Sequence, residues 1–465
     1  MLVLPASASQ KETEKKDSPV KEHLQNHFKL YGFIRNFFVY DSRDSKAGTG
    51  DLFYYLPLDN KWNTADVNNP AREDLNASPN FRFLALTSRV AFDVSGYYIN
   101  NLHFGAKVEG DFYSGLAAAK TANGLSGNTS VSGTAQARLR QAYVTLTWKD
   151  LPMRNDKTAQ MGLKIGQAWH PMAADMPHVF SLEAGAPFGP FSRTPQVTMD
   201  AALGEHWILS AAAIWQQQYQ SAGPDGASAA YMKYACTPEV YAAVTLKGKE
   251  VLFRGGVDVV SIKPRNIGKN ADGLTVHVKD RKTSVLGYLY GQYNHKLLSI
   301  KAKTTFGEGG EHMNLMSGYA VVDKTDPTDW KYASMLNSSS WLSLCYGKKW
   351  QGVLYLGYVK NFGLADKVAP GYIESSDVYF CGNGFSNINQ MYRINPQLLY
   401  NLGKFTLGLE YQWTAVQYGD YRKGEYTING KQVELTSGLN ALALATENLH
   451  WVGNNRVNMM VKFTF

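Results

Sequence analysis

The sequence lacks any apolar run near the roughly 18 to 20 residues that a membrane-spanning helix requires. Hydrophobic residues make up 44% of its 465 residues, and its mean hydropathy is slightly negative. These features exclude a helical membrane protein. They are compatible with a membrane β-barrel, because only every second residue of a barrel strand has to be apolar.

Cysteine is also scarce. The three cysteines, Cys236, Cys345 and Cys381, are widely spaced, and no two of them form a C-x-x-C pair. This number and spacing indicate neither a zinc site nor a disulfide framework. The net charge of +8 arises from lysines and arginines that are scattered along the chain without a dense basic patch. We therefore expect no nucleic-acid partner.

Motifs of catalysis are missing as well. The sequence has no G-x-S-x-G nucleophile motif and no calcium-loop pattern. We therefore expect no enzyme, no catalytic residue and no cofactor. His170 and His178 lie eight residues apart in one irregular segment without a clear third ligand, so we also expect no metal site.

The N-terminus carries a sign of export. Ala6-Ser7-Ala8 forms an A-x-A-like cleavage site at the end of a short apolar segment. We interpret residues 1–8 as the remnant of a signal peptide. Residues 9–27, which mix lysine and glutamate, are interpreted as an N-terminal periplasmic tail.

Segments of about ten alternating apolar and polar residues recur over residues 28–465, as expected for tilted membrane strands. Within residues 102–112, for example, Phe104 and Val108 share one face while Lys107 lies on the other. About sixteen segments begin near Phe28, Asn80, Asn101, Gln136, Thr158, Arg193, Glu205, Cys236, Lys249, Thr283, Lys296, Ser338, Trp350, Gln390, Lys404 and Gly453. The pattern predicts an all-β fold, a transmembrane antiparallel β-barrel of about 16 strands.

The connectors between these segments alternate strictly between short and long. Gly204-Glu205 and Leu402-Gly403 are short, whereas residues 42–78 and 170–192 are long. Outer-membrane barrels have short periplasmic turns and long extracellular loops. Aromatic residues, which favour membrane interfaces, lie beside short connectors at Trp148, Trp207, Tyr293, Trp350 and Tyr400. We therefore expect the chain in the bacterial outer membrane.

The final segment alternates up to its last residues. It ends on Phe463-Thr464-Phe465, a terminal aromatic pattern similar to the insertion signal that outer-membrane barrels present to the barrel assembly machinery. Phe463 and Phe465 are the candidate signal residues.

A barrel of this size is too wide for side chains alone to fill, so we expect a water-filled lumen. Charged residues opposed to apolar neighbours give the pore-lining and selectivity candidates Arg35, Arg89, Lys107, Glu109, Asp111, Arg138, Arg140, Lys164, Arg254, Lys301, Lys303 and Arg393. Basic rings favour anions in a pore, which predicts mild anion selectivity. The alternative is that these charges pair across strands and leave a general pore.

The segment 170–192 is rich in Pro and Gly and has no strand pattern. We predict that it folds inward and constricts the lumen, with the alternative that it lies on the outer surface. The candidate residues of this constriction are His170, Asp175, His178, Glu183 and, where the next strand begins, Arg193.

Several stretches resemble the DcaP-like porin family. Residues 29–35 read K-L-Y-G-F-I-R, and residues 138–144 read R-L-R-Q-A-Y-V. Gly166-Gln167-Ala168-Trp169 and residues 189–197 follow, similar in order to the family's G-Q-x-W strand end and R-x-P-Q strand start. The resemblance implies a homotrimeric sixteen-stranded channel of a Gram-negative bacterium, with small carboxylates among its solutes.

Together these features predict a porin, a passive diffusion channel for small hydrophilic solutes. Its expected partners are those solutes, outer-membrane lipid and lipopolysaccharide, and the assembly machinery. Two other hypotheses stay open. One is an adhesive or structural barrel whose loops bind a partner, and the other, with less support, is a barrel hydrolase.

Overall fold

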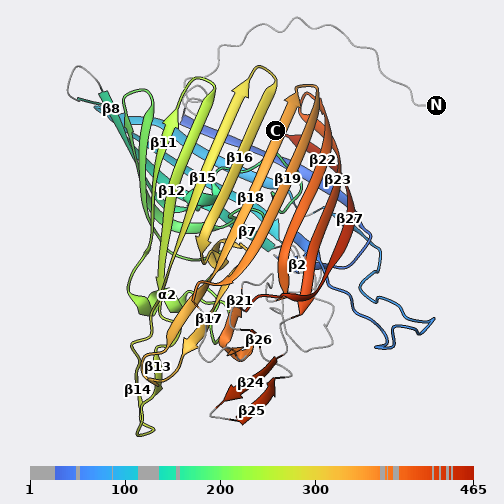
Figure 1. Cartoon of the computed structure of the whole chain (residues 1–465). Helices are drawn as coiled ribbons and strands as arrows, with labels where there is room; N and C mark the ends of the chain where they lie inside the picture. Colours follow the sequence, from blue (N-terminus) through green and yellow to red (C-terminus); the bar gives the residue numbers. More distant parts are fainter. Residues whose placement is uncertain are drawn as a thin grey trace, which may run out of the picture.

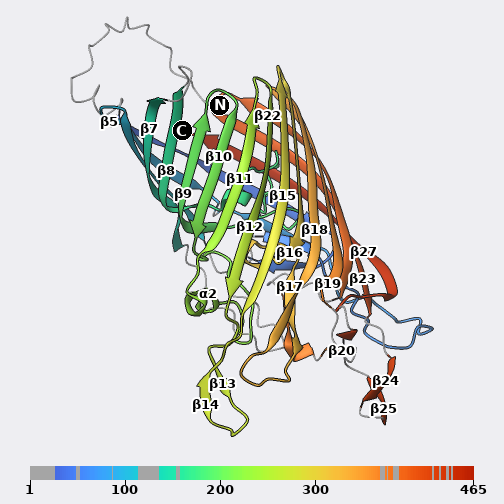
Figure 2. The same cartoon turned by 60° about the vertical axis from the view of Figure 1, so that its left-hand side comes forward.

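The computed structural model describes residues 27–48, 53–85, 87–113, 136–152, 158–366, 372–373, 375–380, 387–420, 424–428, 431–435, 439–440 and 443–465. These residues form a closed antiparallel β-barrel whose strands tilt strongly to the barrel axis (Figures 1 and 2). The predicted signal-peptide remnant 1–8, and the predicted tail 9–27 apart from its last residue, lie outside the described residues.

The wall consists of long strands, each paired with its neighbours in the sequence. They are β1 (Phe28–Asp41), β4 (Asn80–Leu84) with β5 (Arg89–Ile99), β6 (Leu102–Tyr113), β7 (Gln136–Pro152), β8 (Thr158–Trp169), β9 (Arg193–Leu203), β10 (Trp207–Ile214), β11 (Glu239–Lys247), β12 (Val251–Ile262), β15 (Lys282–His295), β16 (Leu298–Glu308), β18 (Lys331–Gly347), β19 (Trp350–Leu364), β22 (Ile388–Leu402), β23 (Phe405–Asp420) and β27 (Glu447–Thr464).

The remaining elements are short and lie in the long connectors. They are β2 (Ser45–Gly48), β3 (Phe53–Pro57), η1 (Pro171–Ala173), α2 (Ala230–Ala235), β13 (Ile267–Lys269), β14 (Thr275–His277), η2 (Glu311–Met313), β17 (Gly318–Asp323), β20 (Tyr372–Ile373), η3 (Ser375–Asp377), β21 (Val378–Phe380), β24 (Gly424–Ile428), β25 (Lys431–Leu435) and β26 (Leu439–Asn440). Among the described residues, no helix is long and apolar enough to cross a membrane.

The pairing of the first and last strands closes the sheet. β1 pairs with β27 from Phe33 opposite Thr464 to Asp41 opposite Arg456. The described sheet has nineteen strands, but β17 and β21 belong to loops, and β4 with β5 forms one interrupted wall strand along β1. Sixteen wall strands therefore remain in the described part of the chain, as the sequence predicts.

The two faces of the wall follow the alternation in the sequence. In β23, the outward side chains of Leu407, Leu409 and Tyr411 are 43–50% exposed, whereas the inward Glu410 and Gln412 are buried. The strands form because one face is apolar and the other is polar, which only a wall between a hydrocarbon and an interior satisfies. The predicted alternation of the barrel is confirmed.

The two ends of the barrel differ. The short connectors after β5, β9, β15, β18 and β22 lie at the rim where β27 ends, and the long loops lie at the opposite rim (Figure 1). Trp350 and Tyr400 pack against each other beside the short connectors, with ring centroids 4.5 Å apart and ring planes inclined at 40°. These rings lie where the sequence places an interfacial girdle.

Some boundaries differ from the sequence prediction. β18 begins at Lys331 rather than near Ser338, and β27 begins at Glu447 rather than near Gly453. The first residues of β18 pair with β17 in a loop. Ala333, Ser334 and Met335 are all buried there, so the burial does not alternate between the two faces. The helix α2 was not expected.

We predict that a charge on the outer face costs stability according to its depth. Leu409→Arg places the guanidinium on the outer face of β23, four residues from the start of the strand at Phe405. It is expected to reduce the free energy of unfolding by about 2–4 kcal/mol in lipid vesicles. Leu402→Arg, beside a short connector, is the control and is expected to cost about 0–1 kcal/mol. Urea unfolding in vesicles measures both, and equal effects would contradict an apolar belt.

Candidate functional site

The loop 170–192, the predicted constriction, folds into the barrel. The amide N of His170 donates to the carbonyl of Ser192 at 3.0 Å, so the two ends of the loop leave β8 and β9 side by side. Pro171 has no N–H to continue the ladder of β8, and η1 begins there. Met172 and Phe188 are completely buried. The loop is thus an interior element of the barrel.

Basic side chains of β12 and β16 hold the first half of this loop. Arg254 forms an ion pair with Asp175 at 2.5 Å. Lys301 donates to the carbonyl of Met176 at 3.2 Å, and Lys303 donates to the carbonyl of Met172. These three bases, predicted to line the pore, therefore bind the loop.

The second half of the loop is anchored to β19, β22 and β27. The carboxylate of Glu183 lies 3.0 Å from Arg456 and 3.6 Å from Arg393, and all three side chains are buried. The hydroxyl of Tyr355 donates to the carbonyl of Gly185 at 3.0 Å. A buried charge has lost its hydration, so it is stable only where ion pairs and hydrogen bonds replace the lost water contacts.

Close packing also holds the loop. A Cβ atom at Gly357 in β19 would lie 2.6 Å from the ring of Phe188, so only glycine lets the ring approach the wall. Arg393 stacks over the same ring, with its guanidinium carbon 4.9 Å from the centroid. Both ion pairs and close side-chain packing therefore hold the loop against the wall.

Two further loop segments enter the same side of the lumen. In the first long connector, the carbonyl of Tyr55 in β3 accepts from Arg393 at 2.6 Å, and that of Pro57 accepts from Tyr418 at 2.6 Å. In the connector after β16, Met313 of η2 accepts from the amide of Phe191 at 2.8 Å. These segments and the constriction loop form one large buried cluster.

The described residues leave space at another side of the lumen. A cavity of about 190 Å³ lies between the constriction loop and the inner face of β1, β5, β6 and β7. Its polar lining comes from Arg35, Thr87, Arg89, Asp111, Arg138, Arg140 and Ser181. Its apolar lining includes Phe53, Trp169, Met176, Val179, Leu182 and Phe191. A basic wall thus faces a mainly apolar loop.

Two carboxylates pair with part of this basic wall. Arg140 lies 2.7 Å from Glu109 and 2.6 Å from Asp111. Arg138 makes two bonds to Asp111, at 2.8 and 2.9 Å, and Arg89 lies 3.7 Å from Glu109. Arg35 contacts Thr87 and the rings of two phenylalanines. The four arginines and two carboxylates leave a formal excess of two positive charges.

Other candidates from the sequence lie nearby but outside this cavity lining. Lys107 forms an ion pair with Asp93 at 3.3 Å, and Lys164 lies over the ring of Tyr143. Arg193 is buried and stacks over Trp169, 4.7 Å from the ring centroid.

The two histidines of the loop lie in different surroundings. His178 donates its backbone N–H to the hydroxyl of Ser343, and its ring lies 2.9 Å from the hydroxyl of Ser299. Burial and the charge of Lys301 lower the pKa of His178 to about 4. His170 instead packs against Glu239 at 2.5 Å. The sequence analysis does not single out Glu239, because nothing in the sequence near this acid indicates that the loop 170–192 packs against it.

Comparisons with known proteins support this architecture. The outer membrane channel DcaP of Acinetobacter baumannii is 17% identical, with a TM-score of 0.56, over 94% of this chain and 97% of that chain. An anion-selective porin from Comamonas acidovorans is 10% identical, with a TM-score of 0.49, over 94% and 99% of the two chains. No protein-family model and no curated protein sequence matches this chain. The likeness to DcaP establishes the fold, a sixteen-stranded barrel of the porin type.

We predict that Glu183→Gln loosens the constriction loop. The change removes the carboxylate that pairs with buried Arg393 and one of the two that pair with Arg456, which keeps Asp41 at 2.7 Å. Breaking a buried pair costs about 3–5 kcal/mol, and we expect a loss in the free energy of unfolding at the lower end of this range. Urea unfolding measures this loss. Glu205→Gln, in an exposed short turn, is the matched control and is expected to have no effect. Equal stability of the two variants would show that Glu183 does not hold the loop.

We also predict that acid weakens the docking of the loop at His178. A released loop takes up a proton near pH 6.5, whereas the docked ring resists protonation until about pH 4. Docking is therefore fully favourable above pH 6.5 and is lost progressively as the pH falls toward 4.

Hydrogen exchange of the loop amides measures this effect between pH 7 and 4.5, after correction for the intrinsic exchange rate. We expect His178→Gln to flatten the pH dependence, and His206→Gln, in an exposed turn, to leave it unchanged. A wild-type loop whose protection does not vary with pH would exclude this role of His178.

Proposed function

We propose that this chain is an outer-membrane porin, a passive diffusion channel for small hydrophilic solutes. The observation that carries the proposal is the cavity of about 190 Å³ inside the barrel, which lies between the loop 170–192 and a wall of arginines in the described part of the chain. A barrel that only served as a scaffold would have no need for desolvated bases facing an open cavity. The apolar outer face and the girdle at the short connectors support a location in the outer membrane.

We further propose a preference for anions. Charged side chains in a low-dielectric channel act strongly on passing ions, and basic rings favour anions. The formal excess of two positive charges at the constriction supports this preference, and small carboxylates fit it. The pairing of Arg138 and Arg140 with carboxylates supports the weaker alternative, a general pore.

A homotrimer forms part of the proposal. Its support is the family resemblance of the R-x-R-x-A-Y and G-Q-x-W motifs, which lie on β7 and β8. The terminal Phe463 and Phe465 support recognition by the barrel assembly machinery. The outward position of the long loops supports contact with lipopolysaccharide.

Planar bilayers with a salt gradient test the channel and its selectivity together. We expect stepwise openings and a reversal potential with the sign given by anion flow. The double variant Arg35→Gln, Arg89→Gln removes the two arginines with the weakest carboxylate contacts and is expected to move the reversal potential toward zero.

Lys249→Gln, in a short connector outside the lumen, is the control and is expected to keep the wild-type value. A cation-selective wild type would refute the anion preference while keeping the channel. No conductance from correctly folded protein would reject the porin itself.

A further inference from the structure

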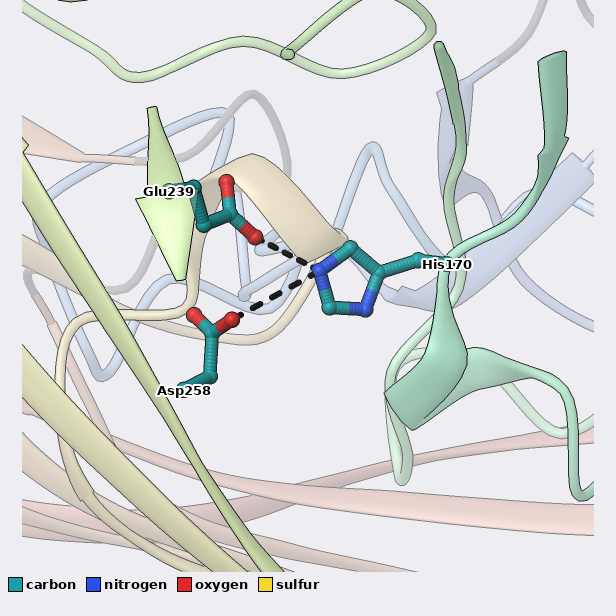
Figure 3. A group of neighbouring side chains, drawn as sticks. All are labelled: His170, Glu239 and Asp258. Carbon is teal, nitrogen blue, oxygen red and sulfur yellow. Dashed lines mark hydrogen bonds and ion pairs between the residues drawn. The ribbon is translucent and has the colours of Figure 1, made fainter. Parts of the chain in front are cut away.

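Four ionisable side chains meet in the interior at a place apart from the arginine-lined cavity. Figure 3 shows His170 from the start of the constriction loop facing Glu239 at the start of β11 and Asp258 in β12. His312 of η2 completes the group. All four side chains are at most 1% exposed.

Their potential ligand atoms converge on one point. The Nε2 atom of His170 lies 2.5 Å from Oε1 of Glu239 and 3.7 Å from Oδ1 of Asp258. The Nε2 atom of His312 lies 3.2 Å from the same Glu239 oxygen and 3.7 Å from Oδ2 of Asp258. Two imidazoles and two carboxylates from four separate segments therefore surround a common centre.

Hydrogen bonds among the described residues do not satisfy this group. Within that part of the chain, the buried Oε2 of Glu239, Oδ1 of Asp258 and both ring nitrogens of His312 have no hydrogen-bond partner. A buried polar atom without a partner costs about 1–3 kcal/mol, and more for a charged group. Several such atoms at one point indicate that a ligand completes the site.

We propose that His170, Glu239, Asp258 and His312 bind one divalent transition-metal ion of the zinc type. Zn²⁺ with bonds near 2.0–2.1 Å places tetrahedral ligand atoms about 3.3 Å apart. Three of these four separations, 3.2, 3.7 and 3.7 Å, lie close to this value, and the two 3.7 Å distances go to different oxygens of Asp258. The contact between His170 and Glu239 has to lengthen.

The chemistry of the ligands selects the class of metal. Two carboxylates balance the charge of a divalent ion, and two imidazole nitrogens favour zinc and its neighbours over calcium or magnesium. Four protein ligands with no open position are typical of structural rather than catalytic sites. The ion would join the constriction loop and η2 to the wall strands β11 and β12.

His170 is the ligand that must change most. Its Nδ1 accepts from the amide of Met172 at 3.1 Å, so without a metal its hydrogen lies on Nε2 and is donated to Glu239. A metal at Nε2 displaces this hydrogen to Nδ1, and the Met172 amide then loses its acceptor. We therefore expect His312, Glu239 and Asp258 to contribute more to the affinity than His170.

Metal content of the folded protein is the decisive measurement. Tag-free protein is refolded in detergent, stripped with EDTA, dialysed against ZnCl₂ and analysed by elemental mass spectrometry. We expect one zinc per chain and a raised unfolding temperature. Substituted Co²⁺ is expected to give the strong visible absorption of a tetrahedral site.

Variants then assign the ion to this cluster. Glu239→Gln and His312→Gln are expected to weaken binding by more than the about 10–100-fold that outer-shell changes cause, and His170→Gln by less than either. The matched control is His295→Gln, which changes an exposed histidine paired with Glu250 at 2.8 Å and should leave one zinc bound.

The proposal is independent of whether the barrel conducts, so a failed conductance experiment leaves it intact. Folded wild-type protein that retains less than stoichiometric zinc would overturn it, as would undiminished binding in Glu239→Gln. If that variant does not fold, the zinc content and cobalt spectrum of the wild type decide.

Discussion

The structure depends on one constraint, that no backbone N–H or C=O group can stay unpaired in a hydrocarbon layer. A sheet meets this constraint only when its first and last strands pair, as β1 and β27 do from Phe33 to Asp41. Closure fixes the strand number and therefore the width of the lumen. The loops and buried charges inside the barrel are consequences of that width.

The lumen is wider than side chains can fill, and the protein fills one side of it with backbone. An inward loop carries peptide groups and charges away from water, and each needs a partner. Lys301, Lys303 and Arg393 donate to loop carbonyls, and Glu183 and Asp175 provide the loop's own ion pairs. The buried lysines and arginines of the wall thus hold the loop in place.

The wall could be predicted from the sequence because each strand carries its own signal. Lipid and water select opposite faces, so alternation marks nearly every strand to within a few residues. The interior could not be predicted in the same way. The contact between Glu183 and Arg456 joins residues 273 positions apart. No local sequence pattern predicts such a contact. In the sequence, Asp175 is a candidate charge of the constriction. In the structure, its carboxylate forms an ion pair with Arg254.

In the proposed channel, the interior contacts also decide which charged side chains act on a solute. The net charge of +8 includes bases that buried carboxylates or loop carbonyls already satisfy, and a paired charge contributes little field to an open channel. Arg254 and Arg456 are of this kind. Arg35 and Arg89 line the cavity instead, and we propose that they and their neighbours on β6 and β7 set the field there. In the proposed channel, selectivity depends on which bases do not hold a loop, rather than on the number of bases in the chain.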